Sequence, residues 1–532
     1  MHLLLTRRIM KKHRESLKIA HRLSINKAVI GLLIVLSVSA AFLYTQGCGQ
    51  PGAINTITLD EPPVNPFVAD SPWPMSHANP YCQASSLYPG PTEDTSEYKF
   101  DYLGELMYYP PITIAISGAY PDGNRVLWGN TPTTVFKAGL DGGRLCYIEK
   151  MEKEPLNVTL SRMECGLSNA YTLVDCEGTF FVPSIRKIFG YGDEVPGDPY
   201  SNIVTKGVFE IPEDQLRSEG EFIVGLSITY DGMLVFVTNK ATVGVVSRSF
   251  DSAHFLHLGE DEETSNSIAC DEDGGIYVVT SKHMYRVQWT GDGLTTNESE
   301  GGWIANYETG GEVGGIRLGM GSGSTPTLMG TGEQDKFVVI TDGQDLMHIV
   351  LFWRDKIPSD WVQIPGTKDR RIAAQIPVTF GNPEATESSS EQSVCVRGYG
   401  ALVVNNQLNT TSEDPIINIV MSQYPDVAPY GAEKFEWDSQ TQELRSVWVN
   451  EEVSLPNGIP AMSAATNLVY DIGQRSGNWT WEALDWDTGK SVFSYEIGNN
   501  SQYNSCWAAT EIGLDGRLYS GSVTGMMCLH PD

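Results

Sequence analysis

Basic residues are scarce in this sequence outside its first 27 positions. The 532 residues include 36 Lys and Arg against 66 Asp and Glu, a formal net charge of −30. Residues 1–27 carry eight basic residues and one acidic residue, so the remaining chain has a net charge of −37. A nucleic-acid-binding surface needs a basic stripe that neutralises phosphates. This lack of positive charge excludes nucleic acid as a partner.

Helical periodicity is also scarce after residue 50. No long stretch has apolar residues at i, i+3, i+4 and i+7, the spacing of an amphipathic helix. Short β-branched or aromatic runs recur instead, separated by turn residues drawn from 53 Gly, 29 Pro and many Asp and Asn. Such runs are typical of strands joined by tight turns. The sequence therefore predicts an all-β protein.

Motifs with defined spacing are missing as well. There is no Cys-x-x-Cys for a thiolate metal site and no Gly-x-Ser-x-Gly for a hydrolase nucleophile. Nine cysteines are present, and eight remain if Cys48 carries a lipid, an even number that suits an oxidising compartment. Cys165 with Cys176 and Cys506 with Cys528 are close enough in sequence to form disulfides between neighbouring strands. We expect these two pairs.

The N-terminus has the pattern of an export signal. Residues 28–44 form an uncharged run of 17 residues behind the basic segment 1–27, with Met10 as an alternative start. Three outcomes are open: lipid attachment at Cys48 after a signal over 28–47, cleavage after residues 38–40, and an uncleaved anchor. All three export the domain, and positive charge before the run places the N-terminus inside. Residues 48–70, rich in Pro and Gly, are expected to be a tether.

The remainder, residues 71–532, repeats one unit. The unit consists of a stretch of small or polar residues, an Asp-Gly turn and an aliphatic or aromatic strand. It is clearest at 226–239, 268–287 and 512–529. Asp-Gly suits a hairpin turn because both residues tolerate positive φ. Repetition over 460 residues favours a radial arrangement, since one flat sheet of that length would expose long edges. We expect a single β-propeller of about eight four-stranded blades, with seven as the alternative.

Two families of propellers resemble parts of this repeat. Residues 483–498 (ALDWDTGKSVFSYEIG) resemble the repeat of pyrroloquinoline-quinone (PQQ) propellers, and 71–86 resemble the Trp-Pro-Met segment that often opens them. Residues 455–473 and 265–280 resemble repeats of gluconolactonase and strictosidine-synthase-like propellers. The adjacent-cysteine pair on which many quinoproteins stack the cofactor is absent, which argues against PQQ. Asp485 and Thr488 are then expected to hold a turn by side-chain hydrogen bonds.

The lactonase-like resemblance implies a metal site. In those propellers a divalent cation, typically Ca²⁺, is held in the central funnel by a Glu, two Asn and an Asp. Asn457, in the run Pro-Asn-Gly-Ile, matches one Asn position, and Asn266 matches the other. No Glu or funnel Asp is identified. The alternative is that Asn457 and Gly458 form only a turn.

One cluster of polar and aromatic residues has no assigned reaction. It surrounds Trp353 and consists of Asp342, Gln344, Asp345, His348, Arg354 and Asp355. These residues are candidates for the lining of a ligand funnel, and the alternative is a network between blades. The glycine-rich segment 310–323 is expected at the rim of the funnel.

The predicted function is ligand or protein binding by an exported, membrane-tethered β-propeller in the cell envelope. The partner would be a small ligand or an envelope protein. The alternative is a Ca²⁺-dependent propeller enzyme of the lactonase or strictosidine-synthase-like kind, and a PQQ-dependent dehydrogenase is less favoured.

Overall fold

The computed structural model describes residues 60–532 except 93, 105, 107–111, 155–159 and 311–316. Cys48 and the hydrophobic run 28–44 lie outside these residues. Within the described part of the chain, no helix is long and apolar enough to cross a membrane.

Eight sheets follow one another along the chain, each built mainly from consecutive antiparallel strands. The first four are β3–β6 (Thr113–Ile116, Leu127–Asn130, Thr134–Asp141, Arg144–Glu152), β7–β10 (Leu173–Val174, Phe180–Ser184, Lys187–Asp193, Ile203–Glu210), β11–β14 (Ile223–Ile228, Met233–Thr238, Thr242–Ser247, Ala253–His257) and β15–β19 (Ala269–Cys270, Gly275–Val279, His283–Trp289, Leu294–Thr295, Trp303–Asn306).

The next two sheets are β20–β23 (Thr327–Met329, Phe337–Thr341, His348–Trp353, Ile372–Pro377) and β24–β27 (Cys395–Arg397, Gly400–Val404, Ala432–Asp438, Glu443–Asn450). The seventh is β28–β31 (Ala461–Ser463, Leu468–Arg475, Asn478–Asp485, Ser491–Gly498), to which β1 (Ser85–Ser86) adds in parallel. The eighth consists of β32–β34 (Thr510–Ile512, Leu518–Gly521, Met526–Pro531) with β2 (Tyr98–Leu103).

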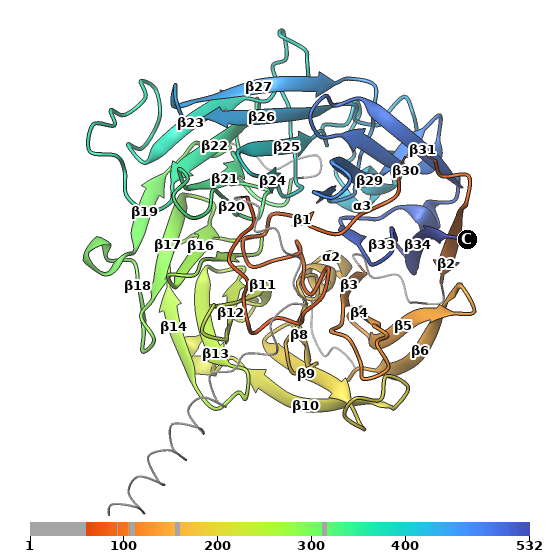
Figure 1. The fold of residues 1–532 in the computed structure, drawn as a ribbon. Helices are drawn as coiled ribbons and strands as arrows, with labels where there is room; N and C mark the ends of the chain where they lie inside the picture. Colours follow the sequence, from red (N-terminus) through yellow and green to blue (C-terminus); the bar gives the residue numbers. More distant parts are fainter. Residues whose placement is uncertain (1–59, 93, 105, 107–111, 155–159, 311–316) are drawn as a thin grey trace, which may run out of the picture. The chain divides into compact units, whose positions relative to one another are not determined.

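The sheets surround a common centre, with the first strand of each sheet innermost (Figure 1). This is an eight-bladed β-propeller, and the prediction of eight blades is confirmed. The last blade closes the ring because β2, from the N-terminal side, pairs antiparallel with β34 at the C-terminus. Closure joins the two ends of the repeat, so no blade is left without a neighbour.

Burial follows the position of a strand within its blade. The second strands β12 and β21 are buried almost throughout, because both of their faces pack against adjacent blades. The outer strands β10 and β27 combine a few buried residues with mostly exposed or half-buried ones, as strands with one solvent-exposed face do. Most of the apolar core therefore lies between blades.

The predicted turns are confirmed. Gly232, Gly274 and Gly516 have φ of +89°, +79° and +77° and join the first to the second strand of blades three, four and eight. In the hairpin β30–β31, the Asp485 carboxylate accepts hydrogen bonds from the Thr488 backbone N–H at 2.8 Å and from its hydroxyl at 2.6 Å.

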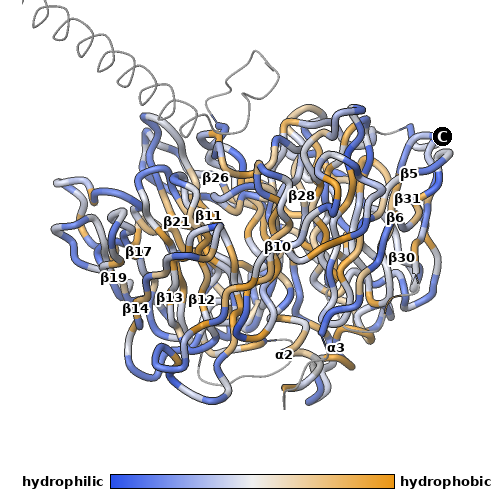
Figure 2. Tube along the Cα trace, turned by 90° about the horizontal axis from the view of Figure 1, so that it is seen from below, coloured by the Kyte–Doolittle hydropathy of each residue, from blue (hydrophilic) through white to orange (hydrophobic). Residues whose placement is uncertain are grey.

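Helices are few and short in the described part of the chain. They are α2 (Arg162–Leu167), α3 (Pro415–Met421) and three single 3₁₀ turns, Glu213–Gln215, Glu298–Glu300 and Ser501–Tyr503. The helices α2 and α3 lie at the same end of the propeller (Figure 2). Met163 of α2 and Ile419 of α3 belong to one apolar cluster with Val523.

A segment that precedes the blades occupies the centre of the ring. Residues 65–86, hereafter the central segment, appear in red and orange in the middle of Figure 1. Backbone N–H groups of six inner strands donate to its carbonyls at 2.8–3.0 Å; the donors are Ile116, Val174, Cys270, Leu328, Val396 and Met462. The inner edge of each blade would otherwise leave these groups unpaired. The tether was expected to extend to residue 70, yet Asn65 and Ala69 are buried against the blades.

Both predicted disulfides are wrong. Cys165, Cys506 and Cys528 are free thiols, so neither pair forms. Cys165 lies in α2, whereas Cys176 lies in the β7–β8 turn and its backbone N–H bonds to Phe67 of the central segment. Cys506 precedes β32, whereas Cys528 lies on β34, two strands further along the chain, so nearness in sequence did not bring either pair together.

Candidate functional site

A cavity of about 60 Å³ lies on the propeller axis, at the ends of the blades where the inner strands begin. Its walls come from the inner strands and from the segments that lead into them, and include Thr113, Tyr171, Asn266, Gly323, Glu391, Ser393, Ile459, Trp507 and Glu511. Leu167, the last residue of α2, also contributes. These residues are far apart in sequence, and ring closure brings them together.

The central segment contributes its residue His77 to the cavity. The side chain is 1% exposed, its Nε2 lies 3.4 Å from the Ser393 hydroxyl, and its ring centre lies 5.7 Å from that of Tyr171. Burial lowers the pKa of His77 to about 4. The imidazole is therefore neutral at pH 7, and the cavity gains no positive charge from it.

Glu391 follows the fifth blade and precedes β24. Burial raises its pKa to about 7, and the nearby Arg317 guanidinium opposes that rise. Its carboxylate accepts a hydrogen bond from the Leu318 backbone N–H at 3.3 Å. A Cβ atom on Gly323 would lie 2.4 Å from this carboxylate, so glycine at that position makes room for it. Glu391 can therefore hold or release a proton near neutral pH.

Glu511 is the second carboxyl group of the cavity. It lies in β32, is 3% exposed, and its Oε2 has no hydrogen-bond partner among the described residues. Burial raises its pKa well above the usual range for Glu, with no charged group among the causes. A buried carboxyl without a partner is held in its neutral form unless something compensates its charge.

A larger recess of about 580 Å³ adjoins the cavity. The two share Leu167, Ser265 and Leu318 as wall residues. The recess continues between blades three and four, past Phe222, Asn239 and Lys282. Leu318 and Gly323 belong to the glycine-rich segment that was expected at the rim of the funnel, and both line the cavity.

The structure separates the two predicted metal-ligand residues. Asn266 lines the cavity, and its amide donates to the Ser322 carbonyl at 2.6 Å. Asn457 does not line it, and its amide donates to the Ile419 carbonyl, the Ser422 hydroxyl and Asn504 Oδ1 beneath α3. Among the described residues, no three His, Cys, Asp or Glu side chains are close enough to hold a metal ion. Of the Asn pair, only Asn266 faces a space that an ion could enter.

The polar cluster around Trp353 is divided between the two ends of β22. Asp342, Gln344, Asp345 and His348 lie at the start of this strand, where the His348 Nδ1 is 2.9 Å from the buried Asp342 carboxylate. None of them lines the central cavity. Their contacts are local, since Asp342 also accepts hydrogen bonds from the backbone N–H groups of Gln344 and His348.

Arg354 and Asp355 follow the other end of β22 and join blades four and five. The buried Arg354 guanidinium lies 4.9 Å from the Tyr81 ring centre. The backbone carbonyl of Arg354 accepts a hydrogen bond from the Trp303 indole N–H. Lys336 lies between Asp355 at 3.5 Å and Glu272 of blade four at 3.9 Å.

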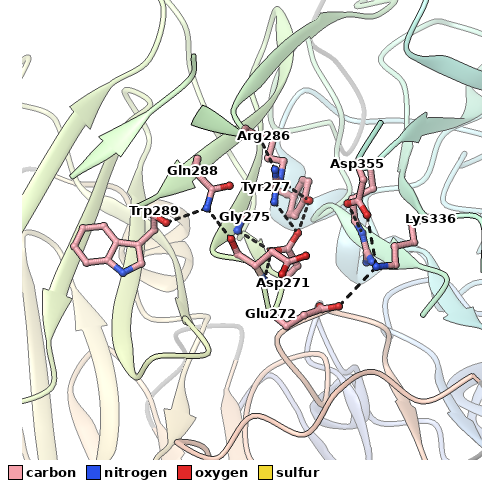
Figure 3. Close-up of polar contacts among 12 residues, drawn as sticks. Asp271, Glu272, Gly275, Tyr277, Arg286, Gln288, Trp289, Lys336 and Asp355 are labelled. Atoms are coloured by element: carbon pink, nitrogen blue, oxygen red, sulfur yellow. Dashed lines mark hydrogen bonds and ion pairs between the residues drawn. The ribbon is translucent and has the colours of Figure 1, made fainter. Parts of the chain in front are cut away.

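The blade-four part of the same network surrounds Asp271 (Figure 3). Its carboxylate accepts hydrogen bonds from the Tyr277 hydroxyl at 2.6 Å and the Gly275 backbone N–H at 2.7 Å. Arg286 donates to the Tyr277 oxygen at 2.9 Å. These contacts support the alternative interpretation, a network between blades, for Arg354 and Asp355.

Sequence patterns missed three of the titratable residues that line the cavity, His77, Glu391 and Glu511. Glu391 and Glu511 stand in segments without a known motif. Their shared signal is positional: Glu391 precedes the first strand of its blade, and Glu511 lies within the first strand of its own. His77 lies in the Trp-Pro-Met segment, whose course through the centre was not predicted.

The fold and the axial cavity thus define a β-propeller with a small, carboxyl-lined central site. No family model matches the chain. A protein of Archaeoglobus fulgidus, described as uncharacterized, is 46% identical over 529 residues, which cover 97% of this chain and 99% of that protein. The chain belongs to the same family as that protein.

Solved structures with related folds are much more distant. They include a streptogramin B lyase (TM-score 0.38, 9% identity, 82% of this chain and 99% of that one) and the periplasmic gluconolactonase PpgL of Pseudomonas aeruginosa (0.40, 13%, 73% and 97%). The C-terminal WD40 domain of Sif2 has a TM-score of 0.43 at 10% identity, with 81% and 99% covered. Such likeness says nothing about function. The resemblance to PQQ repeats stays a prediction.

Proposed function

We propose that this protein is a binding module whose central cavity takes a small ligand. The observation that carries the proposal is the cavity itself, where two carboxyl groups, a neutral imidazole and the Trp507 side chain face one space on the axis. Ligand sites are typically concave, with apolar walls and a few converging polar groups whose pKa values are perturbed.

The test is a small-molecule screen with the full chain in which thermal stabilisation is measured. Ala509→Phe fills the cavity, since Ala509 lines it, and Ala119→Phe adds the same side chain at an exposed position. A true ligand stabilises the wild type and Ala119→Phe but not Ala509→Phe. Stabilisation that persists in Ala509→Phe would place the site elsewhere.

We also propose that the propeller is exported and tethered to the membrane. The support is the sequence of residues 1–48, with its basic segment, apolar run and Cys48. Cell fractionation of the wild type and Cys48→Ala tests the tether. Release of the variant alone supports lipid attachment, retention of both favours an uncleaved anchor, and a soluble wild type contradicts the tether.

A Ca²⁺-dependent propeller enzyme is the second candidate, favoured by one observation. Asn266 lines the same cavity as Glu391 and Glu511, and these oxygen donors suit a hard cation. They would hold the ion, and bound Ca²⁺ would supply polarisation of a carbonyl group or activation of water. About one Ca²⁺ per chain after dialysis, lost in Asn266→Ala and kept in Asn457→Ala, would support it. A metal-free chain that still binds ligand would contradict it.

A further inference from the structure

The direction of the Glu511 side chain follows from the alternation of β32. Side chains of successive strand residues point to opposite faces of the sheet. The hydroxyl of Thr510 lies 3.3 Å from Asp471 Oδ1 in blade seven. Glu511 therefore points the other way, toward blade one, whose first strand contributes Thr113 to the same cavity.

The charge of Glu511 has no counter-ion among the described residues. Its partner in the cavity, Glu391, is near Arg317, which favours the carboxylate form. Glu511 is buried, its Oε2 accepts no hydrogen bond, and no ion pair with it is present in the described part of the chain. Ionising such a group is unfavourable unless a cation is brought to it.

The described walls of the cavity offer two carboxyl groups and aromatic rings but no Lys or Arg. The described residues that line it include no Lys or Arg, and His77 is neutral. Trp507 and Tyr171 present ring systems, which attract positive groups through their faces. An anionic ligand would meet two carboxyl groups and no Lys or Arg among the described wall residues, whereas a cation would gain an ion pair and aromatic contacts.

The two adjoining spaces limit the size of the ligand. About 60 Å³ accommodates a group of a few heavy atoms, since one water molecule needs roughly 10–15 Å³ on the same measure of cavity volume. The recess of about 580 Å³ can hold the remainder of a larger molecule. A ligand that fills both spaces has a small cationic head group on a longer body.

We propose that the ligand of the central cavity is an organic cation with an ammonium-type head group, and that Glu511 is its counter-ion. The inference rests on the proposed function of the cavity as a ligand site. The titratable groups that face the cavity are His77, Tyr171, Glu391 and Glu511, with Arg317 next to Glu391. Of these, Glu511 is neutral and uncompensated, so a bound cation ionises it and displaces its proton into solution.

The test uses n-butylammonium chloride as the probe, with n-butanol as the neutral molecule of similar shape. Binding to the full chain is measured by titration calorimetry at pH 7 in two buffers that differ in ionisation enthalpy, so that released protons are counted. Glu511→Gln removes the charge at constant size. Glu496→Gln is the matched control, because Glu496 is an exposed carboxyl on β31.

We expect n-butylammonium to bind with release of about one proton. Glu511→Gln should weaken binding at least tenfold and abolish the release, whereas Glu496→Gln should match the wild type. Equal binding of n-butanol, unchanged binding by Glu511→Gln, or no binding at 50 mM n-butylammonium would each overturn the proposal. So would an equal response to KCl or CaCl₂ at the same ionic strength, which would indicate an inorganic ion.

Failure of this proposal is distinguishable from failure of the proposed function. A neutral or acidic compound that stabilises the wild type but not Ala509→Phe would leave the cavity a ligand site and overturn only the cationic class. If the screen finds no compound whose effect depends on Ala509, the binding role of the cavity fails as well.

Discussion

At the scale of single residues, this propeller buries several carboxyl groups. Asp471 in β29 is 1% exposed, and burial raises its pKa to about 8. Its Oδ1 accepts a hydrogen bond from the Ile472 backbone N–H at 2.7 Å, whereas its Oδ2 has no partner among the described residues. A Cβ atom on Gly458 would lie 1.8 Å from this carboxyl, so packing against Asp471 favours glycine at position 458.

The raised pKa of Asp471 makes stability depend on pH. The folded protein holds this proton more tightly than the unfolded chain, so the stabilisation is complete below the usual pKa of Asp and is lost as the pH rises toward 8. Asp471→Asn is neutral at every pH. We expect it to match the wild type near pH 4 and to be at least ~1 kcal/mol more stable at pH 8.

Urea unfolding at pH 4, 6 and 8 checks this prediction. Asp345→Asn is the control, since Asp345 is exposed and its substitution should leave the pH profile unchanged. A constant difference between Asp471→Asn and the wild type across this range would contradict the assignment of a buried, protonated Asp471.

At the scale of elements, the central segment is as important as any blade. Its path bends at His77, Ala78, Cys82 and Ala84, which have φ between +51° and +71°. A positive φ costs on the order of 1 kcal/mol at each of these residues, because none of them is glycine. The hydrogen bonds to six inner strands and the burial of Trp73 offset this cost.

Trp73→Ala tests the contribution of this segment. The side chain is fully buried, so its truncation should lower the free energy of unfolding by about 3–5 kcal/mol. Val64→Ala, at a position that is 68% exposed, should change it by less than about 0.5 kcal/mol. Urea denaturation followed by tryptophan fluorescence and circular dichroism provides the measurement. A small effect of Trp73→Ala would mean that the central segment contributes little to the stability of the ring.

Sequence patterns identified many blade hairpins but not this segment. Asp-Gly turns and β-branched runs act within a few residues of each other, which is why blades three, four and eight were visible in the sequence. The central segment has no periodicity, because each of its carbonyls is matched to a different blade. The disulfide predictions failed for a related reason. The distance between two cysteines in the sequence does not reveal where in a blade each one lies.

At the scale of the whole molecule, closure by β2 holds the first and last blades together. Six residues of β2 pair in register with β34, from Tyr98 opposite Pro531 to Leu103 opposite Met526. The apolar cluster that surrounds this junction extends over blades one, six, seven and eight. Loss of β2 would expose the edge of β34 and weaken all of these contacts.

Replacement of residues 98–103 by a glycine–serine sequence of equal length should open the ring. We expect a lower thermal midpoint, a broader transition in calorimetry, and association through the exposed β34 edge in analytical ultracentrifugation. A glycine–serine replacement of the exposed turn residues 439–442 should leave the association state and the sharpness of the transition as in the wild type. Unchanged cooperativity after the loss of β2 would show that contacts between blades suffice for closure.

The sequence by itself determined the class of the fold, the positions of many turns and the acidic character of the domain. These properties follow from residue types and from spacings of a few positions, which are read directly from the sequence. The tertiary structure alone decided what lies at the centre. His77, Glu391 and Glu511 are separated by more than 100 residues from one another, and only ring closure places them around one cavity. Their unusual proton affinities arise from burial there, a property of the assembled ring and of no local pattern.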